Sequence, residues 1–429
     1  MGKISNARFL SLRLFKEDMT NTTNILIALS TLVILSYLFN IVAKYVKIPS
    51  VILLLVTGVG LKLLCDQFSI QITAVHFLLE LFGDIGLIMI VLEGSLDLSI
   101  TRQKLPLVGK SVLSAILVLA ATCGLIYLVI HYYIGMPIRN SIIYSIPMGV
   151  ISSAIAIPSV TALATHKKEF IVYESTFSDI IGIMVFNFAI LDNALSSDSF
   201  RDFFLNILYI IIISFVSSAL LVFMLNRITT HIKSFLIFAI LILVYSVAKM
   251  FHLPSLLLIL VFGMMLNNSK YFIKGRMAKV LQLDKMSKVT SELKLLTAES
   301  AFLIRTFFFI LFGYGMNINS LITPEVIITG SLIIACILFA RFVFLLFISR
   351  THVIPELFIA PRGLVTVVLF YNIPSSFISS LFNVGVLYYV IIVSSIIMML
   401  GLMFTKTKFS EAQGLVLGES DMDGPLGLS

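Results

Sequence analysis

Val172-Tyr-Glu-Ser-Thr-Phe-Ser-Asp-Ile-Ile-Gly-Ile-Met-Val-Phe-Asn187 is the stretch that decides the fold. It lies in an apolar run of about 20 residues, long enough to cross a bilayer as a helix. Yet it carries Glu174, Ser175, Ser178 and Asp179, and a carboxylate at that depth is costly unless a cation, a proton or an arginine compensates it. Helical spacing puts these four side chains on one broad face. A polar seam between helices would explain a lone serine, whereas two acids favour an ion or transport site.

The composition of the whole chain also indicates a membrane protein. The 429 residues are 59% hydrophobic and 12% charged, with a mean hydropathy of +1.08, which excludes a soluble domain of this size. The apolar runs are about 20 residues long and do not alternate over ten-residue segments, which excludes a β-barrel. The sequence therefore predicts an all-α polytopic membrane protein. The three cysteines lie far apart in apolar runs and are interpreted as packing residues.

Thirteen transmembrane helices are predicted from the apolar runs. They lie at 23–46, 48–65, 76–98, 106–134, 140–164, 171–191, 203–226, 232–250, 253–267, 298–317, 322–348, 352–373 and 381–405. The loops on one side carry 19 lysines and arginines, and the other side carries 8. By the positive-inside rule we expect an inner or plasma membrane protein with its N-terminus outside and its C-terminus in the cytoplasm. Only the basic tail from Lys3 to Lys16 opposes this orientation.

The regions outside the spans are short. We expect an N-terminal tail at 1–23, a membrane domain at 24–405 and a short cytoplasmic tail at 406–429. The lysine-rich connection from Asn267 to Thr297 is predicted to be an amphipathic helix on the cytoplasmic surface, in contact with anionic lipid. Because the net charge of +8 is placed on such loops, it indicates membrane lipid and topology, with no nucleic-acid partner.

The membrane domain contains an internal repeat. Residues Lys44–Gly58 align with residues Lys249–Gly263 at a shift of 205, with the lysine, the Pro-Ser pair and the glycine in register. A shift of seven spans is odd, so the second copy enters the membrane from the opposite side. We therefore expect two inverted six-helix repeats, at about 24–191 and 232–405, joined by a connector helix at 203–226.

Two prolines fall at nearly equivalent places in these repeats. Pro158 in span 5 and Pro361 in span 12 each lack the backbone donor of a continuous helix. A simple kink would explain either proline alone. Together they predict two crossed discontinuous helices, whose unwound backbone would line a cavity near the midplane.

Six charged side chains lie deep within the predicted spans: Glu93, Glu174, Asp179, Arg305, Arg341 and Arg362. A buried guanidinium needs a partner, and a carboxylate is the natural one. Arg362 lies beside the break at Pro361, and Glu174 is the acid expected to form a structural ion pair with it. This pairing leaves Asp179 without an obligate partner, flanked by the hydroxyls of Ser175 and Ser178.

An unpaired buried carboxylate can be neutralised by a proton or by a small cation, which then compete for one site. If the crossed helices present Asp179 to each side in turn, that competition becomes exchange. Oxygen ligands suit Na⁺, K⁺ or Li⁺, and no cluster of His, Cys or paired acids suggests a transition metal. We therefore expect a transporter that is not an enzyme and needs no cofactor.

Several motifs resemble the electroneutral sodium/proton antiporters of the NhaP/NHE branch. Glu174-Ser-x-x-Ser178-Asp179 is similar to their Glu-Ser-x-x-Asn-Asp signature, and Pro361-Arg-Gly363 to their Arg-Gly motif. Residues Lys47–Gly58 and Gly83–Asp97 resemble the family's second and third spans. The resemblance covers residues 24–405.

The resemblance implies thirteen helices, a homodimer, and ion or proton binding at Asp179, with Ser175 beside it and Glu93 nearby. It also implies a structural Glu174–Arg362 pair. The sequence departs from the family at two places: Ser178 stands for an asparagine, and Ala156-Ile157-Pro158 stands for Thr-Asp-Pro, so that an expected carboxylate ligand is replaced by Ile157.

The leading hypothesis is a monovalent cation/proton antiporter that exchanges Na⁺ or K⁺ for H⁺ by alternating access, one for one and electroneutral. Two alternatives remain at this stage. One is a non-transporting membrane sensor or scaffold that kept the fold, suggested by Ile157 and Ser178. The other is a uniporter or channel, which would carry current without coupled proton movement.

Overall fold

The computed structural model describes residues 22–46, 49–67, 75–98, 103–160, 163–190, 233–250, 255–268, 283–349 and 354–420, with several positions between 205 and 216. These residues form helices and connecting loops, without a β-strand. In this described part, six helical segments are long and apolar enough to cross a membrane. They are Ser50–Gln67, Leu105–Ile134, Ile138–Ser159, Thr290–Gly315, Pro324–Phe347 and Gly385–Phe404. The all-helical membrane class is confirmed; most of the predicted connector at 203–226 lies outside the described residues.

One group of packed helices, the first bundle, contains α2, α3, α4, α10, α11 and α14. Their bounds are Thr22–Val46, Ser50–Gln67, Val75–Asp97, Lys233–Met250, Ser255–Asn267 and Leu283–Gly315. At its centre, α4 packs against α11 and α14, and α14 also packs against α3.

The other group, the second bundle, contains α5, α6, α7, α8, α16, α17 and α18. Their bounds are Leu105–Leu128, Ile138–Gly149, Ser153–Ser159, Thr165–Ala189, Pro324–Phe344, Leu364–Tyr371 and Gly385–Ser420. A π-helical stretch, Val129–Ile134, continues α5, and another, Leu345–Ser349, continues α16. The short helix α15, Ile318–Leu321, connects the two bundles.

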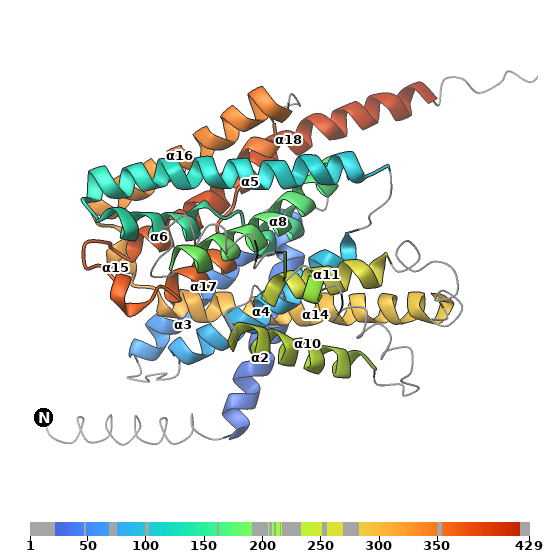
Figure 1. Cartoon of the computed structure of the whole chain (residues 1–429), viewed down its shortest axis with the longest axis horizontal. Coiled ribbons are helices and arrows are strands. Elements are labelled where there is room, and N and C mark those ends of the chain that lie inside the picture. The colour runs from blue at the N-terminus through green and yellow to red at the C-terminus, as the bar shows by residue number, and fades with distance from the viewer. Residues whose placement is uncertain are drawn as a thin grey trace, which may run out of the picture.

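The two bundles meet along α4. Figure 1 shows α5, α16 and α18 on one side of the molecule and α10 and α14 on the other, with α8 and α17 between them. In this interface α4 contacts α7, α8 and α17, and α14 also contacts α17. The short helices α7 and α17 therefore lie at the boundary, where a site between the bundles can form.

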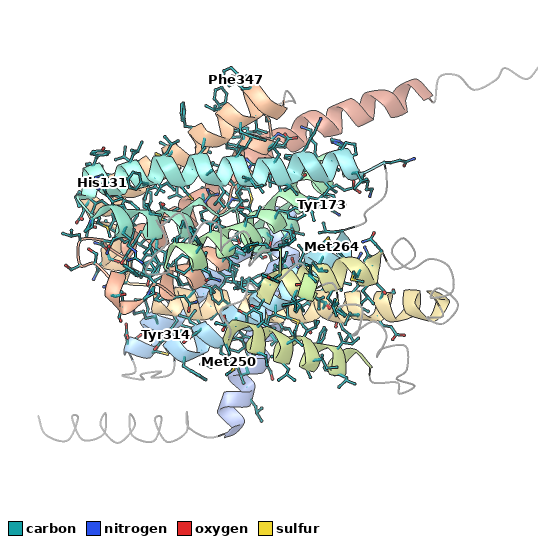
Figure 2. All side chains as sticks on the ribbon, in the orientation of Figure 1. His131, Tyr173, Met250, Met264, Tyr314 and Phe347 are labelled. Atoms are coloured by element: carbon teal, nitrogen blue, oxygen red, sulfur yellow. The ribbon has the colours of Figure 1, made fainter. Side chains whose placement is uncertain are left out.

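Apolar side chains cover the outside as well as the inside of the molecule. Phe347 and Met250, labelled on opposite margins in Figure 2, are 68% and 79% exposed, whereas Tyr173 between them is 3% exposed. In water such large exposed apolar side chains would be unfavourable, but in a bilayer they face hydrocarbon. This distribution fits helices surrounded by lipid.

The helices α3 and α14 approach each other closely through two glycines. A Cβ added at Gly58 would lie 2.1 Å from the carbonyl oxygen of Ile310, and one added at Gly313 would lie 2.4 Å from that of Leu55. Only residues without a Cβ fit at these two positions, which is how small residues let membrane helices pack backbone to backbone.

The lysine-rich segment differs from the sequence prediction. Its described part, from Leu283 to Thr297, is the first half of α14 and continues into the span without a break. The helix continues through this segment because no glycine or proline occurs between Leu283 and Gly313 to end it. At 33 residues, α14 extends well beyond the hydrocarbon core, about 30 Å thick, that its apolar half can cross.

Candidate functional site: a carboxylate at two crossed helix breaks

Two non-helical segments cross at the boundary between the bundles. The chain leaves α6 at Gly149, is extended at Val150 and Ser152, and re-enters a helix at Ser153. The second segment runs from Ile359 to Gly363, just before α17. The two segments touch directly, because the backbone N–H of Ser152 donates to the carbonyl oxygen of Pro361 at 2.9 Å. This hydrogen bond satisfies a backbone donor of one segment and a backbone acceptor of the other, neither of which has a partner within a helix.

The break in span 5 corrects the sequence prediction. Pro361 lies in a non-helical segment as expected, but Pro158 lies inside α7, six residues after Ser152. Its missing N–H removes the helical bond to the carbonyl of Ala154, four residues earlier. That carbonyl instead accepts a hydrogen bond from Arg305 Nη1 at 3.3 Å. Pro158 therefore frees an acceptor for a side chain of the first bundle.

Asp179, on α8, faces the break between α6 and α7. Its side chain is 1% exposed. Oδ2 accepts hydrogen bonds from the backbone N–H of Ser153, at 3.1 Å, and from the Ser153 hydroxyl. Oδ1 has no hydrogen-bond partner, and no described basic group forms an ion pair with this carboxylate. Asp179 is thus held by two donors at one oxygen and is open at the other.

The two serines predicted to flank Asp179 have different surroundings. Ser178 Oγ accepts a hydrogen bond from the backbone N–H of Ile151 at 3.0 Å, so it ties α8 to the break. Ser175 Oγ donates to the carbonyl of Ile171, one turn earlier in α8, at 2.8 Å. Both serines are buried, and of the two it is Ser178 whose hydrogen bond reaches the non-helical segment.

Glu174 pairs with a different arginine from the one expected. Its two oxygens accept hydrogen bonds from Nη1 and Nη2 of Arg341, on α16, at 3.1 and 2.8 Å. Ser114 donates a further hydrogen bond to the same carboxylate, and Arg341 Nε donates to the carbonyl of Glu356 at 2.5 Å. Both members of the pair are 1% exposed. The expected Glu174–Arg362 pair is therefore wrong, because α16 and not the break of span 12 presents its arginine to this face of α8.

Arg362 instead binds backbone carbonyls. Its guanidinium donates to Met148 at 2.7 Å, to Gly149 at 3.1 Å and to Ala360 at 2.8 Å. Met148 and Gly149 are the last residues of α6, whose carbonyls have no partners within the helix. The positive charge also lies at the negative end of the α6 dipole. A permanent cation is thus accommodated by helix-end carbonyls, with no carboxylate among its hydrogen-bond acceptors.

Glu93 and Arg305 form an ion pair within the first bundle, and Arg305 also contacts the second bundle. Glu93 Oε2, on α4, lies 3.4 Å from Arg305 Nη2, on α14, and these side chains are 19% and 12% exposed. Arg305 reaches across the boundary to Ala154 in α7, as described above. Glu93 was expected to contribute to ion binding at Asp179, and in this structure its carboxylate is paired with Arg305.

Sequence reasoning missed Ser153, which donates to Asp179, and the adjacent Ser152, which donates to Pro361. Two consecutive serines interrupt an otherwise apolar stretch of span 5, and they stand a few residues after Gly149. That interruption was the available signal. It was overlooked because Pro158 drew the expected break to a later position.

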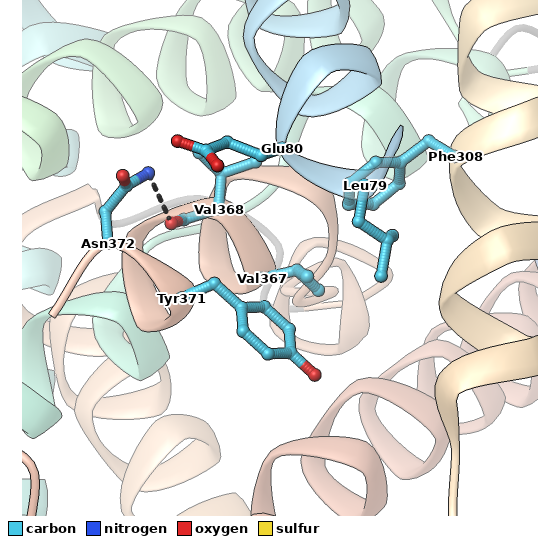
Figure 3. Close-up of a pocket in the computed structure, with 7 residues that line it drawn as sticks. All are labelled: Leu79, Glu80, Phe308, Val367, Val368, Tyr371 and Asn372. Atoms are coloured by element: carbon cyan, nitrogen blue, oxygen red, sulfur yellow. Dashed lines mark hydrogen bonds between the residues drawn. The ribbon is translucent and has the colours of Figure 1, made fainter. Parts of the chain in front are cut away.

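A small cavity lies between the bundles at the far end of α17. Its volume is about 60 Å³, and it is lined by Leu79 and Glu80 of α4, Phe308 of α14, and Val367, Val368, Tyr371 and Asn372 of the α17 segment. Figure 3 shows the Glu80 carboxylate and the Asn372 amide on its wall, with Asn372 Nδ2 donating to the Val368 carbonyl. Because α17 begins beside Ser152, the lining residues of this cavity lie about one to two helical turns along α17 from the crossing.

The described residues contain no group of three or more His, Cys, Asp or Glu side chains that could hold a metal ion. The arrangement at Asp179, with one carboxylate and several hydroxyls, suits a weakly held monovalent cation or a proton.

Comparisons with known proteins fit this arrangement. The family model "Sodium/hydrogen exchanger, transmembrane" matches residues 27–408. The structure of the sodium proton antiporter MjNhaP1 from Methanocaldococcus jannaschii at pH 8 superposes with a TM-score of 0.64 at 18% identity, covering 88% of this chain and 94% of that chain. An electron-microscopy map of MjNhaP1 also gives a TM-score of 0.64, at 17% identity, with 93% and 99% of the two chains covered. None of the curated protein sequences compared with this chain matches it.

Proposed function

The chain belongs to the sodium/hydrogen exchanger family, and from this membership we propose that it exchanges one Na⁺ or K⁺ for one H⁺ at Asp179. Cation/proton exchange is the activity of the family, whose members are membrane transporters and not enzymes. The choice of cation, the one-for-one stoichiometry and the binding of both ions at Asp179 are our proposal.

The burial of Asp179 without an ion-pair partner is the main support for this proposal. An ionised carboxylate that is 1% exposed and has no ion-pair partner is unfavourable in a low-dielectric interior. Either a proton or a cation can neutralise it, and the two exclude each other. Alternate loading of one group by the two ions is the chemical basis of obligatory exchange.

Because Asp179 is a single carboxylate, we expect a stoichiometry of one cation for one proton. The neighbouring ligand groups, Ser153 and Ser178 among them, are neutral hydroxyls. One monovalent cation or one proton leaves the site uncharged, so exchange would be electroneutral. We propose that Ser175 and Glu93 contribute only after local rearrangement, since Ser175 is bonded to Ile171 and Glu93 to Arg305.

Alternating access needs two bodies that can move against each other. We propose that the second bundle, which carries Asp179, moves along α4 and α14 of the first bundle. The narrow contact through α7, α8 and α17 supports such a movement. The cavity at Glu80 and Asn372 would then belong to the path on one side of the membrane.

We also propose a homodimer in the inner or plasma membrane, with the N-terminus outside and the C-terminus in the cytoplasm. Exposed apolar side chains along α2, such as Leu26, Ile34 and Leu38, support an outer face of the first bundle that meets lipid or a second subunit. The orientation rests on the distribution of lysine and arginine among the loops.

Proteoliposomes loaded with a pH-sensitive dye test this function. Addition of Na⁺, K⁺ or Li⁺ to one side should drive proton movement in the purified wild-type protein, without a membrane potential. Asp179→Asn, which keeps the shape but cannot bind a proton or balance a cation, should abolish it. Glu292→Gln, at an exposed position of α14, is the matched control for loss of one carboxylate.

The second candidate is a sensor or scaffold that binds cations without transport. Ile157, where the family resemblance predicts an aspartate, favours it. Absence of proton flux with all three cations, together with cation-dependent stabilisation that requires Asp179, would support this candidate over exchange.

A further inference from the structure

One acid of α4 differs from the other three in its surroundings. The helix carries four carboxylates, and three of them form ion pairs with basic residues of the first bundle. These pairs join Asp84 to Lys249 at 2.6 Å, Glu93 to Arg305 at 3.4 Å and Asp97 to Lys294 at 2.5 Å. Among the described residues, no basic group pairs with the fourth acid, Glu80. Its carboxylate is therefore left uncompensated.

Glu80 lines the small cavity between the bundles. The first bundle contributes α4 and α14 to the wall of this cavity, and the second bundle contributes the α17 segment. Three of the lining side chains are polar, those of Glu80, Tyr371 and Asn372. Figure 3 shows the Glu80 carboxylate pointing toward the Asn372 side chain. Because these two residues belong to different bundles, any movement of one bundle along the other changes the distance between them.

The group opposite Glu80 can accept a positive charge. Asn372 Nδ2 donates to the Val368 carbonyl at 2.9 Å, so the amide oxygen is the end of this side chain that is left to contact an ion. The Tyr371 hydroxyl shares a hydrogen bond with that of Tyr388 at 3.2 Å. A carboxylate on one wall and a neutral oxygen on the other suit a hard monovalent cation.

The cavity has room for a cation that keeps part of its water. Its volume of about 60 Å³ can hold about four water molecules. Its remaining lining residues, Leu79, Phe308, Val367 and Val368, are apolar. A cleft with low-dielectric walls and one sign of charge focuses the field of that charge and raises the local concentration of counter-ions. Glu80 is thus placed to concentrate cations close to the crossing.

We propose that Glu80 is the entry residue for the cation on the outer side of the membrane. Its carboxylate attracts a hydrated monovalent cation into the cavity before the ion moves on to Asp179. This inference rests on the proposed exchange and its proposed orientation, in which the N-terminal end of α4 faces outward. Glu80 acts on one side and through its charge, so its effect depends on the side of cation addition and on ionic strength. Loss of Asp179 should affect both sides at any ionic strength.

Glu80→Gln tests the proposal against Glu325→Gln as a matched control. Glu325 is an exposed acid in the first turn of α16 and does not line the cavity. It lies at the same end of the molecule, because the short α15 links α16 to the end of α14, where a Cβ at Gly315 would lie 3.9 Å from Leu79 Cδ1. The half-saturating concentration of Na⁺, K⁺ or Li⁺ for proton flux is measured in right-side-out and in everted vesicles, from a host without other cation/proton exchangers. Each measurement is made at low ionic strength and again in concentrated choline chloride.

We expect Glu80→Gln to raise the half-saturating concentration roughly threefold for cation added to the outer side at low ionic strength, since one charge beside the path is lost. The value for cation added to the other side should not change. Choline chloride should remove the difference by screening. Glu80→Asp, which keeps the charge, should stay close to the wild type, and Glu325→Gln should match the wild type throughout.

A thiol probe measures the potential of the cavity without transport. Asn372→Cys, in a protein from which the three native cysteines have been removed, is treated with methanethiosulfonate reagents of opposite charge. The ratio of the reaction rates for the cationic and the anionic reagent should fall when Glu80→Gln is added. Addition of Glu325→Gln should leave this ratio unchanged.

Wild-type cation dependence in Glu80→Gln, with exchange intact, would overturn the proposal. A shift on both sides, a shift on the cytoplasmic side alone, or a shift that persists in choline chloride would also overturn it. Equal effects of Glu80→Gln and Glu325→Gln would do the same, by assigning the effect to general surface charge. Absence of flux in the wild type would instead refute the proposed exchange, and the ratio of thiol reaction rates would still show whether Glu80 sets the potential of the cavity.

Discussion

Arg341 and Glu174 face each other as a bidentate ion pair that is 1% exposed at both ends, with nitrogen–oxygen distances of 3.1 and 2.8 Å. The pair joins α16 to α8, the helix that carries Asp179. Removal of one partner from a buried pair leaves an uncompensated charge, at a cost of about 3–5 kcal/mol. We expect Arg341→Met to be strongly destabilising, as measured by thermal melting in detergent.

A second substitution separates this pair from its neighbour. Glu174→Gln should recover much of the stability lost in Arg341→Met, because both charges are then absent. The same substitution should not rescue Arg362→Met, since Arg362 is bonded to carbonyls of Met148, Gly149 and Ala360. Rescue of the Arg362 variant would show that the observed pairing is incorrect.

Gly58 and Gly60, two residues apart on α3, should differ sharply in their tolerance of a methyl group. A Cβ at Gly58 would lie 2.1 Å from the backbone oxygen of Ile310, whereas a Cβ at Gly60 would meet nothing within 4 Å. Gly58→Ala must push α3 away from α14, so we expect a clear loss of melting temperature and of folded yield. Gly60→Ala should match or slightly exceed the wild type, since alanine favours the helix. Equal behaviour of the two variants would contradict the close packing of α3 on α14.

Pro158 and Arg305 should be coupled, because both act on the carbonyl of Ala154. Pro158→Ala would supply the missing helical N–H, which competes with Arg305 for that acceptor. We therefore expect Arg305→Met to change the exchange rate less in the Pro158→Ala background than in the wild type. A double-mutant cycle of exchange rates measures this difference. Additive effects would indicate that the contact between α14 and α7 has no part in transport.

The helical class of the fold could be predicted from the sequence, because a chain that crosses a bilayer must satisfy its backbone hydrogen bonds within apolar helices. Apolar runs of helical length predicted the all-helical class, and the acids of 172–187 drew attention to the helix that carries Glu174 and Asp179. The ends of the helices were harder to predict. Pro158 is tolerated in α7 because Arg305 supplies a donor for Ala154, and the lysine-rich Leu283–Thr297 continues into α14 because nothing in it ends a helix.

The surroundings of the candidate site could be predicted only in part, because they depend on which helices pack together. Charge and expected burial were enough to name Asp179 as a candidate, but the choice of Arg341 over Arg362 as partner of Glu174 depends on which helix packs against α8. Ser152 and Ser153 were missed because a serine in an apolar span usually bonds back to its own helix, as Ser145 does. The break before α7 lets Ser153 donate to Asp179 and Ser152 donate to Pro361.

Proton flux driven by a cation gradient, compared between the wild type and Asp179→Asn in proteoliposomes, tests the central claim most directly. The wild type should acidify or alkalinise the lumen according to the direction of a Na⁺ or K⁺ gradient, with no current, and the folded Asp179→Asn protein should be inactive. Undiminished cation-driven flux in Asp179→Asn would contradict the assignment of both ions to this carboxylate.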